Sequence, residues 1–143
     1  NGQHSFYQLL HQGTDIVPLQ FVGFKKNQME TDVVIQGSTS QQKLCANVAA
    51  QIMAFACGKA DENRNKNFEG GRPSSIIIGE QVNPGALGAL LAHFENKVMF
   101  QGFLWNVNSF DQEGVQLGKV LAKRVLAHET DGALKAFSDL LEI

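Results

Sequence analysis

The sequence predicts an α/β fold with a helical C-terminal tail. Two runs rich in β-branched residues, DIVPLQFVGF and SIIIGE, predict strands at Ile16–Val22 and Ser75–Glu80. A helical pattern precedes the first strand, a second joins the strands, and three more follow. Two strands are too few for a self-sufficient doubly wound sheet, which suggests that the chain is part of a longer protein.

The N-terminal segment predicts a short helix followed by a marginal strand. Apolar residues at helical spacing, ended by a glycine, place the helix at Gln3–Gln12, with His4 at its open end. Pro18 lacks an amide donor, so the first strand is expected at a sheet margin or bulge. The polar stretch Lys25–Gly37 predicts a loop.

The helix between the strands is expected to begin at Ser38 or Ser40 and to end at Gly58. Its apolar stripe consists of Leu44, Val48, Ile52 and Phe55. Cys45 and Cys57 lie in this helix and are too few and too widely spaced for a disulfide framework or a metal site. Two buried free thiols are expected, as is usual in a reducing cytoplasm.

The turn Gly70–Pro73 contains an arginine and leads into the second strand. A basic turn can bind phosphate, but this one does not open a helix, so it is interpreted as a turn that directs the strand. After Asn83 and Pro84, a predicted N-cap and first helical residue, the chain is mostly helical. The expected division is residues 1–80 as the α/β part and 81–143 as the helical part.

Composition excludes several classes of protein. The 143 residues are 43% hydrophobic and 18% charged, which is typical of one packed domain. The formal charge of -2, without a long basic run, argues against nucleic-acid binding. The longest apolar-rich stretch, Leu87–Trp105, contains charged residues and is not expected to span a membrane. The four histidines lack metal-ligand spacing, so no metal site is predicted.

Gln112 and Lys119 are predicted to share one line on a helix that starts at Ser109, because seven residues at 100° leave an offset of about 20°. Gly114 and Gly118 lie in the apolar arc beside this line, which is tolerated where another backbone or a ligand approaches closely. Two simpler readings stay open. Ser109 and Gln112 fit a capping box, and a lysine at the edge of an apolar stripe often extends its ammonium into water.

His4 can likewise be interpreted in two ways, as a proton-transfer group or as an exposed histidine without a role.

Two separate stretches then indicate a family. NGQHSFYQLLHQGT at the N-terminus and GFLWNVNSFDQEGVQLGK at residues 102–119 resemble segments of the phosphoglucose isomerase family. FEGGRPSS and GALLAHFENKVMFQG, in the same order between them, are similar too. The chain departs at Gln116, where the family usually has glutamate.

The resemblance implies the C-terminal part of a sugar-isomerase (SIS-type) three-layer α/β/α domain with a helical tail. It also implies reversible conversion of glucose 6-phosphate to fructose 6-phosphate, a step of glycolysis and gluconeogenesis, through ring opening and an enediol, without a cofactor. His4 and Lys119 match the family residues that move protons during ring opening. Gln112 matches a glutamine that lines the sugar pocket.

In the family the glutamate base, the enediolate-stabilising arginine and the phosphate loop precede this segment, so the chain alone is expected to be inactive. The resemblance further implies a cytoplasmic homodimer in which His4 serves the neighbouring subunit's site. Two rival functions remain open at this stage: a non-catalytic sugar-phosphate-binding module, and a structural helical tail that wraps a partner subunit.

Overall fold

The computed structural model describes residues 2–143. The chain divides into two compact units, residues 1–92 and residues 93–143, and each is described by itself. The first unit contains the predicted pair of strands, β1 (Leu19–Lys26) and β4 (Ser74–Gln81). These strands pair in parallel, as an α/β architecture requires.

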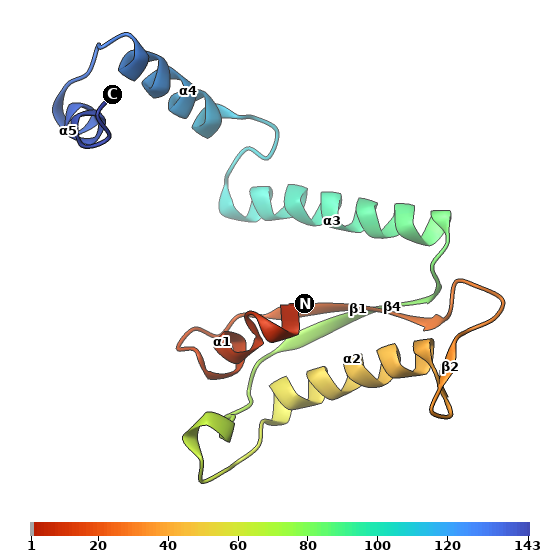
Figure 1. Ribbon diagram of the computed structural model, residues 1–143. Coiled ribbons are helices and arrows are strands. Elements are labelled where there is room, and N and C mark those ends of the chain that lie inside the picture. The colour runs from red at the N-terminus through yellow and green to blue at the C-terminus, as the bar shows by residue number, and fades with distance from the viewer. Residues whose placement is uncertain (1) are drawn as a thin grey trace. The chain divides into compact units, whose positions relative to one another are not determined.

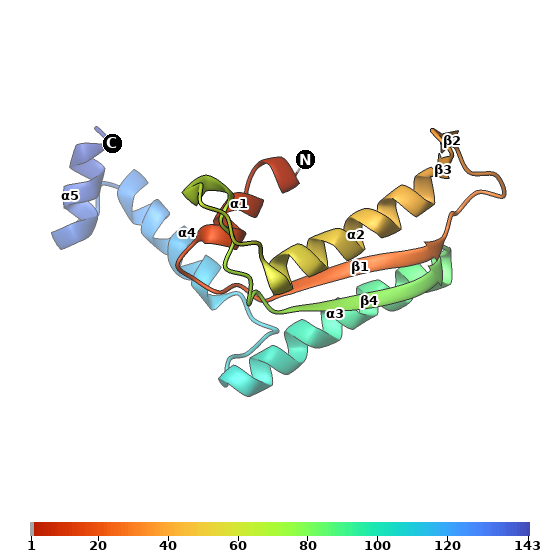
Figure 2. The same ribbon diagram turned by 90° about the horizontal axis from the view of Figure 1, so that it is seen from below.

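A long helix, α2 (Ser40–Cys57), lies between the two parallel strands in the sequence and packs along them in space. Figure 1 shows β1 and β4 side by side, with α2 running beside them, and Figure 2 shows the same arrangement from below. Parallel strands need such a crossover connection because no tight turn can join them. The β1–α2–β4 unit therefore confirms the predicted order of strand, helix and strand.

The first strand is displaced from its predicted position at Ile16–Val22. It begins after Pro18, where the amide of Leu19 donates to the carbonyl of Pro73, and continues to Lys26. The polar sequence at its end predicted a loop from Lys25 onward, but pairing with β4 holds that part of the chain extended. Tertiary pairing has overridden local composition here.

The predicted loop also contains a small antiparallel hairpin of β2 (Val34–Ile35) and β3 (Ser38–Thr39). Its two turn residues, Gln36 and Gly37, have φ values of 56° and 77°. Positive φ at both central positions is the geometry of a tight two-residue hairpin turn. Glutamine is an unusual residue for the first of these positions, so the sequence did not predict the hairpin.

Helix α2 ends at the predicted Gly58 but begins with a different cap. The hydroxyl of Thr39, and not of Ser38 or Ser40, accepts from the Gln42 amide at 3.1 Å, and the Gln42 side chain accepts from the Thr39 amide at 2.9 Å. This reciprocal capping box is available to Thr39 because its backbone is extended at the end of β3. Gly58 has a φ of 64°, and a Cβ there would lie 2.2 Å from a carbonyl of the following loop.

The N-terminal helix predicted at Gln3–Gln12 is two pieces. A 3-10 turn, η1 (Gly2–His4), is followed by α1 (Tyr7–Gln12). The amides of Ser5 and Phe6 both donate to the carbonyl of Gly2, which closes the turn before α1 starts. A second 3-10 turn, η2 (Arg64–Lys66), lies in the loop before β4.

The core of the first unit is small. Phe55 of α2 is fully buried, whereas Leu44 on the same predicted stripe is 62% exposed. An open apolar groove of about 500 Å³ lies between α2 and the strands. Its apolar lining includes Val22, Phe24, Leu44, Val48, Ile52, Ile76 and Ile78. Parallel sheets are usually covered on both faces, so this groove is the kind of surface that further chain covers.

The prediction of buried thiols is wrong for this chain, because Cys45 and Cys57 are both exposed. The reason is the same open surface. Cys45 lines the open groove between α2 and the strands.

The rest of the chain is helical. Helix α3 (Pro84–Trp105) begins in the first unit and ends in the second, which also holds α4 (Glu113–Leu126) and α5 (Gly132–Leu140). The predicted cap of α3 is confirmed, since the side-chain oxygen of Asn83 accepts from the Ala86 amide at 2.8 Å. Proline at the first helical position costs nothing there, because that amide has no partner inside the helix.

Candidate functional site

His4 is the last residue of η1, and its side chain is exposed. The expectation that it lies at the open end of a longer helix is therefore wrong, because α1 starts three residues later. The turn is nevertheless held in place. The side chain of Gln3 donates to that of Asn47 on α2 at 2.7 Å. The imidazole of His4 therefore lies exposed on a short turn that is anchored to α2.

Helix α1 is packed on the end of α2 by aromatic rings. The imidazole of His11 stacks on Phe55, and the ring of Tyr7 meets Phe55 edge-on with centroids 5.2 Å apart. The Arg72 guanidinium, from the turn before β4, donates to the carbonyls of His11 at 3.1 Å and Gly13 at 2.9 Å. These contacts fix the segment that follows His4.

The proximity of Arg72 also changes the chemistry of His11. Burial, and then the positive charge of Arg72, lower the pKa of the His11 imidazole from its ordinary value. Both effects disfavour the charged ring. His11 is therefore a packing residue stacked on Phe55, whereas the side chain of His4 is exposed. From the sequence, the turn that contains Arg72 was predicted only to direct the following strand. Its contacts with the end of α1 were not predicted, although an arginine between glycines and a proline is an unusual turn residue.

Gln112 lies in the second unit, at the N-cap of α4 rather than within it. Its carbonyl accepts from the amides of Val115 and Gln116, so it opens the helix, but its side chain makes no capping bond. The predicted capping box does not form, because the Ser109 hydroxyl donates instead to the carbonyl of Val98 at 3.3 Å. The start of α4 is therefore four residues later than Ser109.

Lys119 lies two helical turns beyond Gln112 and is exposed. Seven residues of helix separate the two by about 10.5 Å along the axis. Apart from chain neighbours and the backbone of α4 itself, no atom of residues 2–143 comes within 4 Å of a Cβ placed at Gly114 or Gly118. The close approach that these glycines predict is therefore not made within the described residues. The face that presents Lys119 is open. His4 belongs to the first unit, and Gln112 and Lys119 belong to the second.

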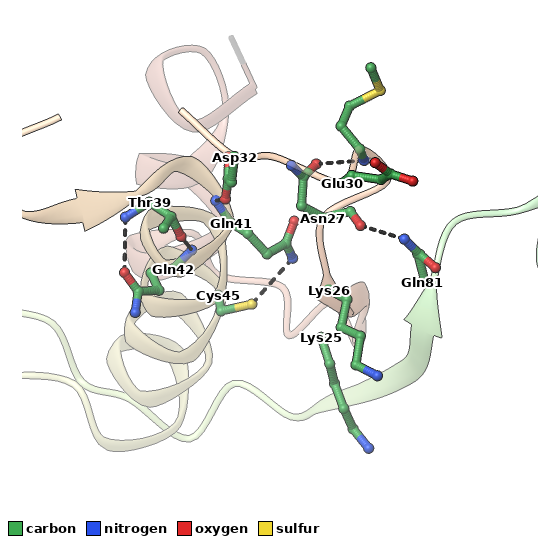
Figure 3. Close-up of a pocket in the computed structure, with 11 residues that line it drawn as sticks. Lys25, Lys26, Asn27, Glu30, Asp32, Thr39, Gln41, Gln42, Cys45 and Gln81 are labelled. Atoms are coloured by element: carbon green, nitrogen blue, oxygen red, sulfur yellow. Dashed lines mark hydrogen bonds between the residues drawn. The ribbon is translucent and has the colours of Figure 1, made fainter. Parts of the chain in front are cut away.

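A cleft of about 630 Å³, lined mostly by residues with polar side chains, lies in the first unit at the carboxyl ends of β1 and β4, beside the start of α2. Figure 3 shows its lining. The polar side chains are Lys25, Lys26, Asn27, Glu30, Asp32, Thr39, Gln41, Gln42 and Gln81. Ligands of open α/β sheets bind at this end of the strands, so the cleft is a second candidate site, which the sequence did not predict.

Much of the charge in and around this cleft is already compensated by the chain. The carboxylate of Asp32 accepts from the Gln41 amide at 2.9 Å, at the N-terminus of α2, and this bond lowers its pKa. At the rim Lys25 pairs with Glu80, whose pKa is lowered first by the hydrogen bond and then by the charge of that lysine. An internal carboxylate thus occupies the helix N-terminus, where a ligand anion would otherwise bind.

Residues 2–143 contain no group of three histidine, cysteine, aspartate or glutamate side chains placed to hold a metal ion. Over the same residues, every helix is too short or too polar to cross a bilayer.

A parallel β-α-β unit followed by helices defines an α/β protein, and an open apolar groove lies between its helix α2 and its strands. The model of the phosphoglucose isomerase family matches residues 1–139. The chain belongs to the phosphoglucose isomerase family.

Relatives with strong similarity carry one name. A glucose-6-phosphate isomerase of Treponema denticola is 71% identical over 99% of this chain, and one of Treponema pallidum is 62% identical over all of it. A crystal structure of a glucose-6-phosphate isomerase from Chlamydia trachomatis covers 98% of this chain with a TM-score of 0.80 and 50% identity. The SIS-type α/β fold expected from the sequence is confirmed by this likeness.

The match covers only part of each relative. This chain spans 27% of the two Treponema proteins and 27% of the Chlamydia chain. The open groove and the small core of the first unit agree with that proportion.

Proposed function

We propose that this chain forms part of a glucose-6-phosphate isomerase, which interconverts glucose 6-phosphate and fructose 6-phosphate. The observation that carries the proposal is 71% identity over 99% of the chain to a relative of that name. At this similarity both family segments, around His4 and around Lys119, lie within the match. The expected domain assignment, the C-terminal part of the second sugar-isomerase domain plus a helical tail, is part of this proposal.

His4 and Lys119 carry proton transfer during ring opening in this proposal. Opening the cyclic sugar removes a proton from the hydroxyl on C1, forms the C1 carbonyl, breaks the bond from C1 to the ring oxygen and protonates that oxygen. One group must accept a proton and another must supply one, and positioned groups of this kind contribute about 10²–10⁴-fold. The exposed imidazole and the exposed ammonium suit these two tasks. Gln112 binds sugar hydroxyls beside them.

The later transfer of a proton between C2 and C1, through an enediol, needs a base that the resemblance places outside this chain. We therefore propose that the chain alone is inactive. We also propose that the complete protein is a cytoplasmic homodimer in which His4 serves the neighbouring subunit's site. It acts on a sugar phosphate and needs neither a metal nor an organic cofactor. Nucleic acid and membranes are not among its proposed partners.

The test uses a hybrid enzyme, in which this chain replaces the matching segment of the Treponema denticola isomerase. Turnover of fructose 6-phosphate is measured for the hybrid and for its His4→Gln, Lys119→Met and Gln112→Ala variants. Lys123→Met, one turn further along α4, and His93→Gln are the matched controls. A loss of at least tenfold, about 1.4 kcal/mol of transition-state stabilisation, is expected for His4→Gln and Lys119→Met, but not for the controls.

Full turnover in both variants would refute the assigned roles. A hybrid that binds fructose 6-phosphate without converting it, while its Treponema parent is active, would favour the non-catalytic binding module. If the hybrid is active and every variant has unchanged turnover, the rival function of a structural helical tail is favoured.

Subunit mixing tests the shared site. His4→Gln subunits are mixed with Lys119→Met subunits under conditions that exchange them. If each site takes His4 from one subunit and Lys119 from the other, half of the sites in a mixed dimer are intact, and random mixing restores about one quarter of the original activity. If both residues come from one subunit, the mixture stays inactive.

A further inference from the structure

Arg72 is a buried cation with an unusual set of partners. Its side chain is 7% exposed, and its guanidinium donates to the carbonyls of His11 and Gly13 at the C-terminal end of α1. None of the ion pairs found within residues 2–143 includes Arg72. Burying a guanidinium without a carboxylate is costly, and helix carbonyls with their negative dipole end offset only part of that cost.

The same residue joins two helices. The Arg72 amide donates to the carbonyl of Phe55 at 3.0 Å, near the end of α2, while its side chain holds the end of α1. Its Nε atom and the Nδ1 atom of His11 are buried and find no hydrogen-bond partner in the part of the chain described. An apolar side chain would fill this space at lower cost, so packing alone does not account for the arginine. Its fork of donors instead sets the direction of α1.

The direction of α1 determines where His4 lies. The chain from Gly2 to Gln12 is one continuous hydrogen-bonded segment, in which Leu10 donates to Phe6, and Phe6 to Gly2. The segment is tied down at both ends, by Gln3 to α2 at its start and by Arg72 at its finish. Without Arg72, the segment is held by the exposed Gln3 bond, by the exposed bonds from the Gln12 side chain to the loop before β4, and by the aromatic contacts. Arg72 provides the buried tie at the end of α1.

We propose that Arg72 is a positioning residue for His4: by binding the C-terminal carbonyls of α1, it holds the imidazole at the orientation that ring opening needs. This inference rests on the proposed function of His4. Arg72 touches no substrate in this proposal and acts only through α1.

The experiment measures ring opening separately from isomerisation in the hybrid enzyme. Interconversion of the α and β anomers of glucose 6-phosphate passes through the open chain but moves no carbon-bound proton, so its rate, followed by NMR exchange, reports ring opening alone. Exchange of the hydrogen on C2 with solvent reports the later step. Both are measured for Arg72→Met, which keeps the stem, and for Arg72→Lys, which also keeps the charge but lacks the fork.

Both variants are expected to slow anomer interconversion at least tenfold. For substrate that binds in its open-chain form, the rate at which the hydrogen on C2 exchanges with solvent is expected to fall less. Asn83→Ala is the matched control, because it removes the cap of α3 and lowers stability without touching α1. Its anomer interconversion is expected to be unchanged at temperatures where all variants are folded.

A double-mutant cycle separates positioning from general stability. If Arg72 acts through His4, then Arg72→Met causes no further loss of ring opening once His4→Gln is present. Equal, independent losses in both backgrounds would overturn the inference, as would normal ring opening in Arg72→Lys or Arg72→Met. If His4→Gln alone leaves ring opening unchanged, the proposed role of His4 has failed instead. Should Arg72→Met not fold, the same cycle is run with Arg72→Lys.

Discussion

The imidazole of His11 lies flat against the phenyl ring of Phe55, with ring centroids 3.9 Å apart and planes 10° from parallel. One residue comes from α1 and the other from α2, so this stack joins the turn that carries His4 to the helix behind it. Phe55 is fully buried in the chain, which makes this contact the centre of the small core.

Phe55→Ala is therefore expected to lower the free energy of unfolding of the hybrid enzyme by about 3–5 kcal/mol, because it removes a buried ring and leaves a cavity. Urea unfolding provides the measurement. Phe55→Leu, which fills much of the same volume, is expected to lose clearly less. Equal losses for the two substitutions would mean that the stack, and not the volume, holds α1.

Stability is expected to fall as the solution is acidified from about pH 6.5, the ordinary pKa of histidine. Burial and then Arg72 lower the pKa of His11, so the unfolded chain takes up this proton at a higher pH than the folded chain does. The difference favours unfolding as the pH drops below the ordinary value, and it has no further effect below the folded pKa. Above that window the contribution of His11 is constant.

His11→Phe keeps the ring and removes the titration, so urea midpoints between pH 5 and 7 are expected to fall less steeply for this variant than for the parent hybrid. Asp32 and Glu80 do not interfere, because their pKa values are lowered and they titrate in more acidic solution. Parallel curves for the two proteins would contradict the lowered pKa of His11.

Thr39→Ala is expected to cost about 1 kcal/mol of stability, within a range of about 0.5–2 kcal/mol, since it removes one half of the capping box of α2. Thr39→Ser keeps the hydroxyl and is expected to retain most of the stability. Ser40→Ala, at the position next to it, is the comparison that tests which residue is the cap. A larger loss at Ser40 would reverse the assignment.

Gly102→Ala is expected to destabilise the protein, although alanine is the better helix former by about 1 kcal/mol. A Cβ at this buried position of α3 would lie 2.0 Å from the Ser109 hydroxyl and 2.8 Å from the carbonyl of Val107. Gly88→Ala on the same helix meets nothing within 4 Å in residues 2–143 and is expected to be neutral or slightly stabilising. Adding Ser109→Gly should restore part of the loss; no restoration would place the clash elsewhere.

Local patterns predicted the elements whose ends are set by backbone chemistry. Gly58 ends α2 because only glycine fits its positive φ, and Asn83 with Pro84 begins α3 because both suit a helix start. The family segments around His4 and Lys119 were likewise readable, because residue types at fixed spacing are sequence properties. The roles of His4, Gln112 and Lys119 stay predictions until the variants are measured.

Contacts between distant segments decided what the sequence could not. Pairing with β4 moved β1 to Leu19–Lys26, and the bond from Ser109 to Val98 took away the cap that would have started α4 earlier. The contacts of Arg72 with α1 and α2 join segments that are distant in the sequence, so local patterns could not predict them.

By itself, then, the sequence determined the α/β class, the order of the elements and the family. It could do so because hydrophobic period, cap residues and motif spacing are local. The tertiary structure alone decided that Arg72 is buried beneath α1, that the pKa of His11 is lowered, and that a cleft forms at the ends of β1 and β4. Burial, hydrogen-bond partners and pKa depend on which distant residues meet, and that is a property of the packed chain.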